Sequence, residues 1–447
     1  MGRPEPPAAG IVNKRWLWSA LPSLLLAILA VLIRLGGTSA WDLGDGALHY
    51  LQARWAPWHA YLFFDRWAKP VYVVLGTAFA QWGPAGMVVF DALLAAATAI
   101  TILTLIGPDR KRAAWLVPIM LFGSIQYFKV VVSGLTEPLF GLASVLAVLL
   151  LFRRRYTAAM ALLSFTPFIR PEYVVLAPML VLWTAYKRQW KALPWLALGP
   201  VLYMLAGRAM LGERFLNFAR DPYEDNTLYP PGGWDNFLVQ AADILGDPLL
   251  ILFLLCLPVM ALLWSKDRTR RPAYQAIMVL VLAPVVGIWA IHSYAYWAGG
   301  HGSAGLLRVL ATATPLTVLF VAYTLFHAAR HWEIKRPALL FGLFTLGYFA
   351  WAQDDLRYRL PLPARPTTEQ LMVEAAMKDA MAQIGPGGRI ATAHPYSAVL
   401  VGHDPWAPDH AGSDYLDLAT LELGDILEWN SEYATQRPDL AGFPAAG

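Results

Sequence analysis

The segment from Trp16 to Leu35, WLWSALPSLLLAILAVLIRL, decides the fold, because it is long and apolar enough to cross a lipid bilayer as a helix. Lys14 and Arg15 precede it, as basic residues precede a signal peptide. The apolar run is longer than the hydrophobic part of a typical signal peptide. We therefore expect an uncleaved membrane anchor whose N-terminus is cytoplasmic.

Apolar residues dominate the rest of the chain as well. Hydrophobic residues make up 57% of the 447, the mean hydropathy is +0.45 and 15% are charged, whereas soluble domains carry about 25% charged residues. The net charge is +4, and the basic residues lie in short clusters between apolar runs, which is typical of cytoplasmic loops and not of a nucleic-acid-binding face. The single cysteine, Cys256, excludes an intramolecular disulfide. The composition predicts an all-α polytopic membrane protein.

Hydropathy and the basic clusters together predict about eleven transmembrane helices. If every basic cluster faces the cytoplasm, the N-terminus is cytoplasmic and the C-terminus lies outside. The predicted spans are 16–36, 87–107, 114–133, 136–152, 157–169, 173–186, 192–210, 248–265, 274–294, 305–326 and 337–353.

The spans leave three long segments on the outward side. The first outward loop covers 37–86 and contains an apolar stretch, 71–82, that is too short to cross. We expect this stretch to lie at the membrane interface. The other two outward loops cover 213–247 and 296–308, and the second is rich in glycine.

A change of composition divides the chain into two domains. Residues 1–353 form the predicted transmembrane domain, and residues 354–447 contain no further span. In this tail the pattern predicts an amphipathic helix over 367–384 and a short strand over 389–393, separated by a glycine-rich turn. The tail is therefore predicted to be a small α/β domain outside the cytoplasm.

The stretch WDLGDGALHY, residues 41–50, is the first place to look for chemistry, since it follows the first span directly. Asp42 and Asp45 lie three residues apart, and charge beside a bilayer is costly. One carboxylate can act as a general base on a sugar hydroxyl while the other holds that hydroxyl or a metal. Alternatively, an aspartate here caps a helix that begins near Ala47. The spacing leaves both interpretations open.

Other polar residues fall on the same predicted side. Glu137 begins a span, where it either favours the helix dipole or binds a ligand. Arg170 and Glu172 flank a proline, and they either pair with buried charges or contact a substrate. Arg308 begins a span after the glycine-rich loop, and its guanidinium either binds phosphate or reaches lipid headgroups. Two weaker candidates for substrate contacts are Lys129 and His301.

Several short stretches together resemble the integral-membrane glycosyltransferases of the GT-C superfamily, including its mannosyltransferase and aminoarabinose-transferase-like branches. The resemblance covers about the first three quarters of the chain and leaves the tail unmatched. The stretches are GDGALHY (44–50) with KPVY (69–72), SGLTEPLF (133–140), FIRPEY (168–173) and GSAGLLR (302–308) followed by Pro315.

The resemblance implies a sugar transfer with inversion from a polyprenyl-phosphate-linked donor to a lipid, glycan or protein acceptor outside the cytoplasm. Asp45 matches the presumed base of that superfamily, and Asp42 is its companion. The family's acidic pair is often closer together in sequence, and this departure leaves open whether a divalent cation, Mg²⁺ or Mn²⁺, binds at Asp45 and Glu137. Arg308 would hold the donor phosphate.

Two other classes of function remain as alternatives. A lipid or solute transporter or flippase would carry ionisable residues near mid-membrane and an internal repeat, and the sequence shows no repeat. A non-catalytic membrane subunit would keep the fold without the chemistry. The composition favours a bacterial inner membrane, with the site facing the periplasm.

Overall fold

The computed structural model describes residues 14–40, 42–107, 110–212, 230–299, 304–360, 362, 364–385, 388–392, 394–402, 404–407 and 424–428. These residues are mostly helical, as predicted. Six segments are long and apolar enough to cross a membrane, and the chain is a multi-pass membrane protein. They comprise α1 (Lys14–Leu35), α4 (Pro84–Ile106), η4 (Trp190–Ala197) with α11 (Leu198–Leu211), α14 (Asp247–Lys266), α15 (Arg271–Ile277) with η5 (Met278–Leu282) and α16 (Ala283–Ala298), and η6 (Leu307–Ala313) with α17 (Thr314–His331).

A seventh segment is bent. Helices α6 (Leu116–Phe122) and α7 (Ile125–Val131) meet at 81°, and the break between them falls at Gly123 and Ser124. The short helix α5 (Arg110–Ala113) leads into this pair. The two helices count as one broken span or as a re-entrant loop by their length and composition.

The remaining predicted spans correspond to helices that are shorter or less apolar. They are α8 (Glu137–Phe152), α9 (Tyr156–Leu163) with η3 (Thr166–Phe168), α10 (Tyr173–Tyr186) and α18 (Pro337–Arg359). Eleven crossings are therefore not confirmed: the described residues provide six candidate spans, or seven with the bent pair.

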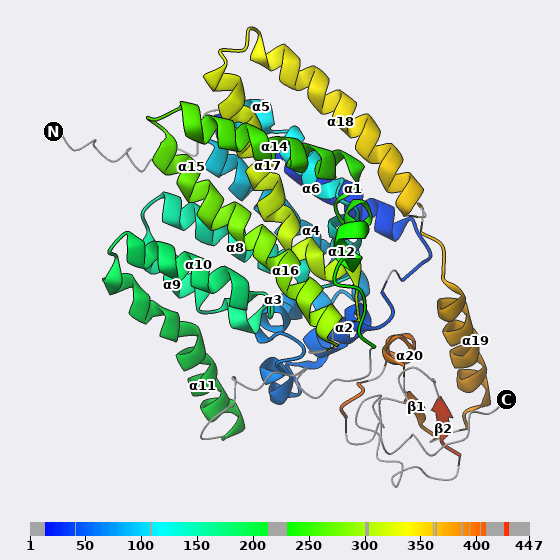
Figure 1. Ribbon diagram of the computed structural model, residues 1–447. Helices are drawn as coiled ribbons and strands as arrows, with labels where there is room; N and C mark the ends of the chain where they lie inside the picture. The colour runs from blue at the N-terminus through cyan, green and yellow to red at the C-terminus, as the bar shows by residue number, and fades with distance from the viewer. Residues whose placement is uncertain are drawn as a thin grey trace.

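Helix α17 forms the centre of the bundle (Figure 1). Within an 18-residue apolar window of Leu307–His331, 89% of the residues are buried inside the protein, whereas 11% are buried in such a window of Trp190–Leu211. Large apolar side chains remain exposed on the outer helices, as expected for surfaces that contact lipid. Many hydroxyl side chains inside the bundle, such as those of Thr98, Thr317 and Thr324, donate to a backbone carbonyl four residues earlier, so that few polar groups face hydrocarbon.

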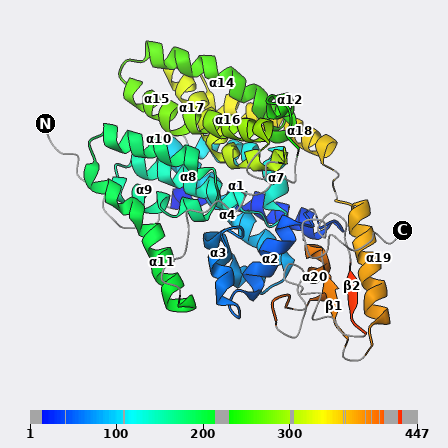
Figure 2. The same ribbon diagram turned by 60° about the horizontal axis from the view of Figure 1, so that its bottom comes forward.

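The first loop and the tail lie at the same end of the bundle (Figures 1 and 2). The first loop contains α2 (Asp45–Trp55), η1 (Ala60–Phe64) and α3 (Pro70–Ala80), and α12 (Asn236–Val239) and α13 (Ala241–Leu245) precede α14. The tail contains α19 (Thr368–Gln383), β1 (Ile390–Thr392), α20 (Pro395–Val401) and β2 (Ile426–Glu428), and its two strands pair in parallel. Helix α19 and strand β1 lie within the ranges predicted for them.

Hydrogen bonds join this tail to the chain that follows α1. The backbone N–H groups of Thr38 and Ser39 both donate to the carbonyl oxygen of Ala364, at 3.1 and 3.3 Å. Gln370 of α19 is buried; its Oε1 accepts from the N–H of Ala40 at 2.8 Å and its Nε2 donates to the carbonyl of Thr38 at 3.0 Å. The tail therefore fixes the backbone that leads into the first loop.

Candidate functional site

A cavity of about 370 Å³ opens where the first loop meets the ends of several bundle segments. This volume falls in the range of small-molecule sites. Its charged lining residues come from segments far apart in the chain: Asp45 and Lys69 from the first loop, Glu137 from the start of α8, Arg170 and Glu172 from the turn before α10, and Arg308 from η6.

Arg308 joins the two aspartates of the first loop. Its Nη1 contacts a carboxylate oxygen of Asp42 and its Nη2 contacts one of Asp45. The side chain of Asp45 is 44% exposed and lines the cavity, whereas that of Asp42 is 12% exposed and does not line it. The sequence proposed both aspartates and Arg308 separately, and the structure brings the three together.

Asp42 also organises the start of α2. Its Oδ1 accepts a hydrogen bond from the N–H of Gly46 at 2.6 Å, which satisfies one of the free donors at a helix N-terminus. Burial raises the pKa of the Asp42 carboxyl, and the guanidinium of Arg308 opposes that shift. Asp42 thus has both the structural role of a cap and a charge role toward Arg308, and Asp45 is the carboxylate that reaches the cavity.

A second ionic network forms the opposite wall. Nη1 of Arg170 lies 2.7 Å from Oε1 of Glu137 and donates to Oγ1 of Thr136 at 2.9 Å. Nε and Nη2 of Arg170 donate to the carboxylate of Glu172 at 3.0–3.1 Å. Nε2 of His292 lies 3.1 Å from the same carboxylate. Arg170 and Glu172 therefore pair with each other and with other buried charges.

Glu137 differs from the other acids of the cavity. It is buried, and its Oε2 has no hydrogen-bond partner among the described residues. A buried acceptor without a donor is costly, and this oxygen belongs to a residue that lines the cavity. Glu137 can therefore accept a hydrogen bond from a molecule bound there.

Close backbone packing brings the start of α8 to the start of α2. A Cβ atom on Gly46 would lie 2.3 Å from the carbonyl oxygen of Ser133, so a side chain cannot be placed there without movement. Gly134 has a φ of +72°, a conformation that favours glycine. These two glycines, both within the stretches that suggested the family resemblance, allow the loop before Glu137 to approach Asp45.

The sequence interpretation overlooked a buried aspartate below this loop. Asp91 of α4 is fully buried, its two carboxylate oxygens accept from the hydroxyl of Tyr72 at 3.1 and 3.2 Å, and it accepts a further hydrogen bond from the N–H of Leu135. The signal was available, because Asp91 is an isolated acid inside an apolar run and such residues usually have partners.

The aromatic wall of the cavity was not predicted either. His49 and Trp67 both line it, and their rings stack with centroids 5.0 Å apart. Burial lowers the pKa of His49 to about 3, so the imidazole is neutral at physiological pH. Its Nδ1 is buried and has no hydrogen-bond partner among the described residues. Nothing in the sequence spacing of Trp67 linked it to His49.

Lys129 does not line the cavity, and His301 lies outside the described residues. Lys129 lies in the last turn of α7, where it interacts electrostatically with Asp42 and Arg308 but is absent from the cavity lining. His301 and most of the glycine-rich loop around it, residues 300–303, lie outside the described residues.

The donor set fits a divalent cation poorly. In the part of the chain that the structure describes, no three His, Cys, Asp or Glu side chains are grouped as metal ligands. The two carboxylates proposed for the metal, Asp45 and Glu137, already contact Arg308 and Arg170. The guanidinium groups of the two arginines balance the charge of these carboxylates in this arrangement.

Comparison with known proteins does not add a family. No protein-family model, no curated protein and no solved structure matches the chain.

Proposed function

We propose that the protein is a membrane glycosyltransferase of the GT-C type that transfers a sugar from a polyprenyl-phosphate donor to an acceptor hydroxyl. The observation that supports this best is the cavity in which Asp45 and Glu137 meet Arg308 and Arg170. It combines a partly exposed carboxylate for proton removal with cations for a phosphate, at an end of a bundle of apolar helices. The family resemblance of the surrounding stretches supports the same class.

In the proposed reaction, Asp45 takes the proton of the acceptor hydroxyl. The acceptor oxygen then forms a bond to the anomeric carbon from the face opposite the phosphate, the bond between that carbon and the phosphate oxygen breaks, and the lipid phosphate leaves with the electron pair. This in-line displacement inverts the anomeric configuration. Arg308 stabilises the charge that develops on the leaving phosphate.

The contact between Arg308 and Asp45 gives this proposal an order of events. In the absence of donor, Arg308 donates a hydrogen bond to the carboxylate of Asp45. A donor phosphate next to Arg308 competes with Asp45 for the same N–H donors. Donor binding would therefore release Asp45 to act as a base only when the leaving group is in place. Glu137, whose Oε2 lacks a partner, would accept a hydrogen bond from a sugar or acceptor hydroxyl.

The proposal includes the membrane placement predicted from sequence. Eleven crossings put the N-terminus in the cytoplasm, and the first loop and the C-terminal domain outside it, in a bacterial inner membrane. The support is the distribution of basic clusters and the position of the first loop and the tail at one end of the bundle. The acceptor is a lipid, a glycan or a protein on that side.

The test compares cells that carry Asp45→Asn with cells that carry wild type or Asp379→Asn. Asp379 is an exposed residue of α19 and serves as a matched control. At equal membrane levels, we expect only Asp45→Asn to lose a sugar from the surface glycans or glycolipids and to accumulate a polyprenyl-phosphate sugar. If the profile changes in a full deletion but not in Asp45→Asn, Asp45 is not the base. If the deletion itself changes no glycan, the enzyme proposal fails and a transporter or a non-catalytic subunit takes its place.

A further inference from the structure

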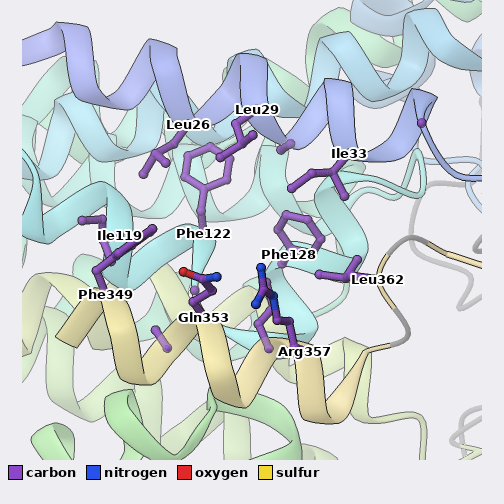
Figure 3. A pocket seen from close by; sticks show the side chains of 15 residues that line it. Leu26, Leu29, Ile33, Ile119, Phe122, Phe128, Phe349, Gln353, Arg357 and Leu362 are labelled. Atoms are coloured by element: carbon purple, nitrogen blue, oxygen red, sulfur yellow. The ribbon is translucent and has the colours of Figure 1, made fainter. Parts of the chain in front are cut away.

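A second cavity lies beside the first helix, α1. It has a volume of about 540 Å³ and is formed between α1, the bent pair α6–α7 and α18. Figure 3 shows the apolar side chains of α1 facing those of α6, α7 and α18 across it. No residue that lines it also lines the cavity at Asp45. Its main apolar walls are Leu26, Leu29, Ile33, Phe122, Phe128 and Phe349.

This cavity continues along the bundle. A further volume of about 920 Å³ shares Leu26, Leu29, Ile119 and Phe349 with it. The shared residues show that the two spaces adjoin, so that one groove runs between α1 and α18. Residues of α5 close to the far end of this groove are basic, and Lys111 and Arg112 are among its lining.

One cation distinguishes the end of the groove near the tail. Among the described side chains that line the 540 Å³ cavity, Arg357 alone is charged and Gln353 is the only other polar one. Both extend from α18 into the space between α18 and the bent pair (Figure 3). The amide oxygen of Gln353, in the orientation that satisfies both residues, accepts from Nη2 of Arg357 at 2.8 Å. A guanidinium has five N–H donors, and no carboxylate among the described residues forms an ion pair with Arg357.

We propose that this groove binds an anionic glycerophospholipid, with an acyl chain between α1 and α18 and the phosphate at Arg357. The groove lies beside helices that are candidate spans, and Leu29 on its rim is 46% exposed, so hydrocarbon chains of the bilayer can enter it. A guanidinium matches the geometry of a phosphate, and basic pockets between transmembrane helices bind anionic headgroups. A single positive charge at this end of an apolar groove calls for a ligand with a long apolar chain and a net negative head.

The groove also explains how α18 is held. Helix α18 packs on α14, α5 and α6. The two cavities lie between α18 and α1. An acyl chain there fills the space between α1 and α18 with apolar contacts. Because α18 leads into the tail, the bound lipid stabilises the position of the tail on the bundle.

The test measures lipid retention by the purified full chain in a non-ionic detergent. Dioleoylphosphatidylglycerol and dioleoylphosphatidylcholine are the probes, and native mass spectrometry counts the bound molecules while thermal unfolding gives the stabilisation. We expect the anionic lipid to be retained about five-fold more strongly, which corresponds to about 1 kcal/mol for one basic residue at a membrane surface. Arg357→Ala should remove this preference, and Arg365→Ala, an exposed arginine near the start of the tail that does not line the groove, should not.

A second pair of variants tests the apolar part of the groove. Leu29→Trp fills the groove and should reduce retention of both lipids, whereas Leu24→Trp alters an exposed position of α1 outside the groove and should not. Equal retention of the two lipids by wild type, or wild-type retention by Arg357→Ala, would overturn the proposal. Displacement of the anionic lipid by an equimolar polyprenyl phosphate would also overturn it, because the groove would then belong to a lipid carrier. None of these measurements depends on glycosyl transfer, so the proposal stands or falls separately from the proposed function.

Discussion

Arg170→Gln is the most informative single change in the protein, because one guanidinium serves two buried carboxylates. Glu137 and Glu172 are each 2% exposed, and Arg170 contacts both, at 2.7 and 3.0 Å. Removing one member of a buried ion pair costs about 3–5 kcal/mol, because a charge is left in a low-dielectric environment without compensation. We therefore expect Arg170→Gln to lower the free energy of unfolding by about that amount.

The second step of this experiment neutralises the orphaned charge. Glu172 keeps His292 as a neighbour at 3.1 Å, whereas Glu137 loses the one ion-pair partner that it has among the described residues. The double variant Arg170→Gln with Glu137→Gln should therefore be more stable than Arg170→Gln alone. The stability effects of two residues in one ionic network are not additive, and the double variant measures the coupling energy between them.

The assay is thermal unfolding of purified protein in detergent at one fixed heating rate, since membrane proteins often unfold irreversibly and the midpoint then depends on the rate. Arg365→Gln, at an exposed position, is the control. The reasoning is refuted if Arg170→Gln unfolds at the same temperature as the control. It is also refuted if the double variant unfolds at a lower temperature than Arg170→Gln alone, because the carboxylate of Glu137 would then not be the charge that needs compensation.

Three other predictions concern the packing, the protonation and the support of the site. Gly46→Ala should sharply reduce the folded yield, since its Cβ would lie 2.3 Å from the carbonyl oxygen of Ser133, and Gly342→Ala, with nothing within 4 Å, should not. His49 has a pKa of about 3 in the folded protein against 6.5 when exposed, so the unfolded state binds more protons between these values. The contribution of neutral His49 to the free energy of unfolding should be fully present above pH 6.5 and fall by about 1.4 kcal/mol per pH unit below it. His49→Phe should flatten this slope when unfolding is measured against pH. Gln370→Leu removes the hydrogen bonds to the backbone before Asp42, and it should lower sugar transfer in cells at equal protein level.

The control for Gln370→Leu lies in the same helix, α19. Met372→Ala alters an exposed position of α19 and should leave sugar transfer intact; an equal loss in both variants would mean that α19 matters only for folding. An unchanged pH slope in His49→Phe would assign the acid sensitivity to other groups. A normal yield of Gly46→Ala would mean that the loop before Glu137 can move away from α2 at little cost.

The sequence was sufficient where one physical property decides the outcome. Long apolar runs predicted α1, α4 and α14 to within a few residues, because backbone groups in hydrocarbon must pair within a helix. Isolated charges beside these runs pointed to Asp45, Glu137, Arg170 and Arg308, which line one cavity. The free-energy cost of placing a polar group near lipid explains both predictions, because such a group usually has a partner or a function.

Features that depend on contacts between distant segments could not be predicted. The 81° bend at Gly123 and Ser124 interrupts an apolar run whose hydropathy gives no sign of it. Hydropathy also placed spans at α8, α9 and α10, which are shorter than the six candidate spans. The contact of Arg308 with Asp42 joins residues 266 positions apart, and the stacking of His49 on Trp67 depends on how the first loop folds back.

The separation of 266 positions between Asp42 and Arg308 also means that the two residues are synthesised at different times. A ribosome that adds about 5–20 residues per second needs on the order of 13–50 s to reach Arg308 after it has made Asp42. During that interval every earlier span has been synthesised while the aspartates lack their guanidinium. Their place in a loop beside the first span lets water solvate them in the meantime. A chain that stops before η6 therefore contains both acids of the first loop but lacks the guanidinium that joins them.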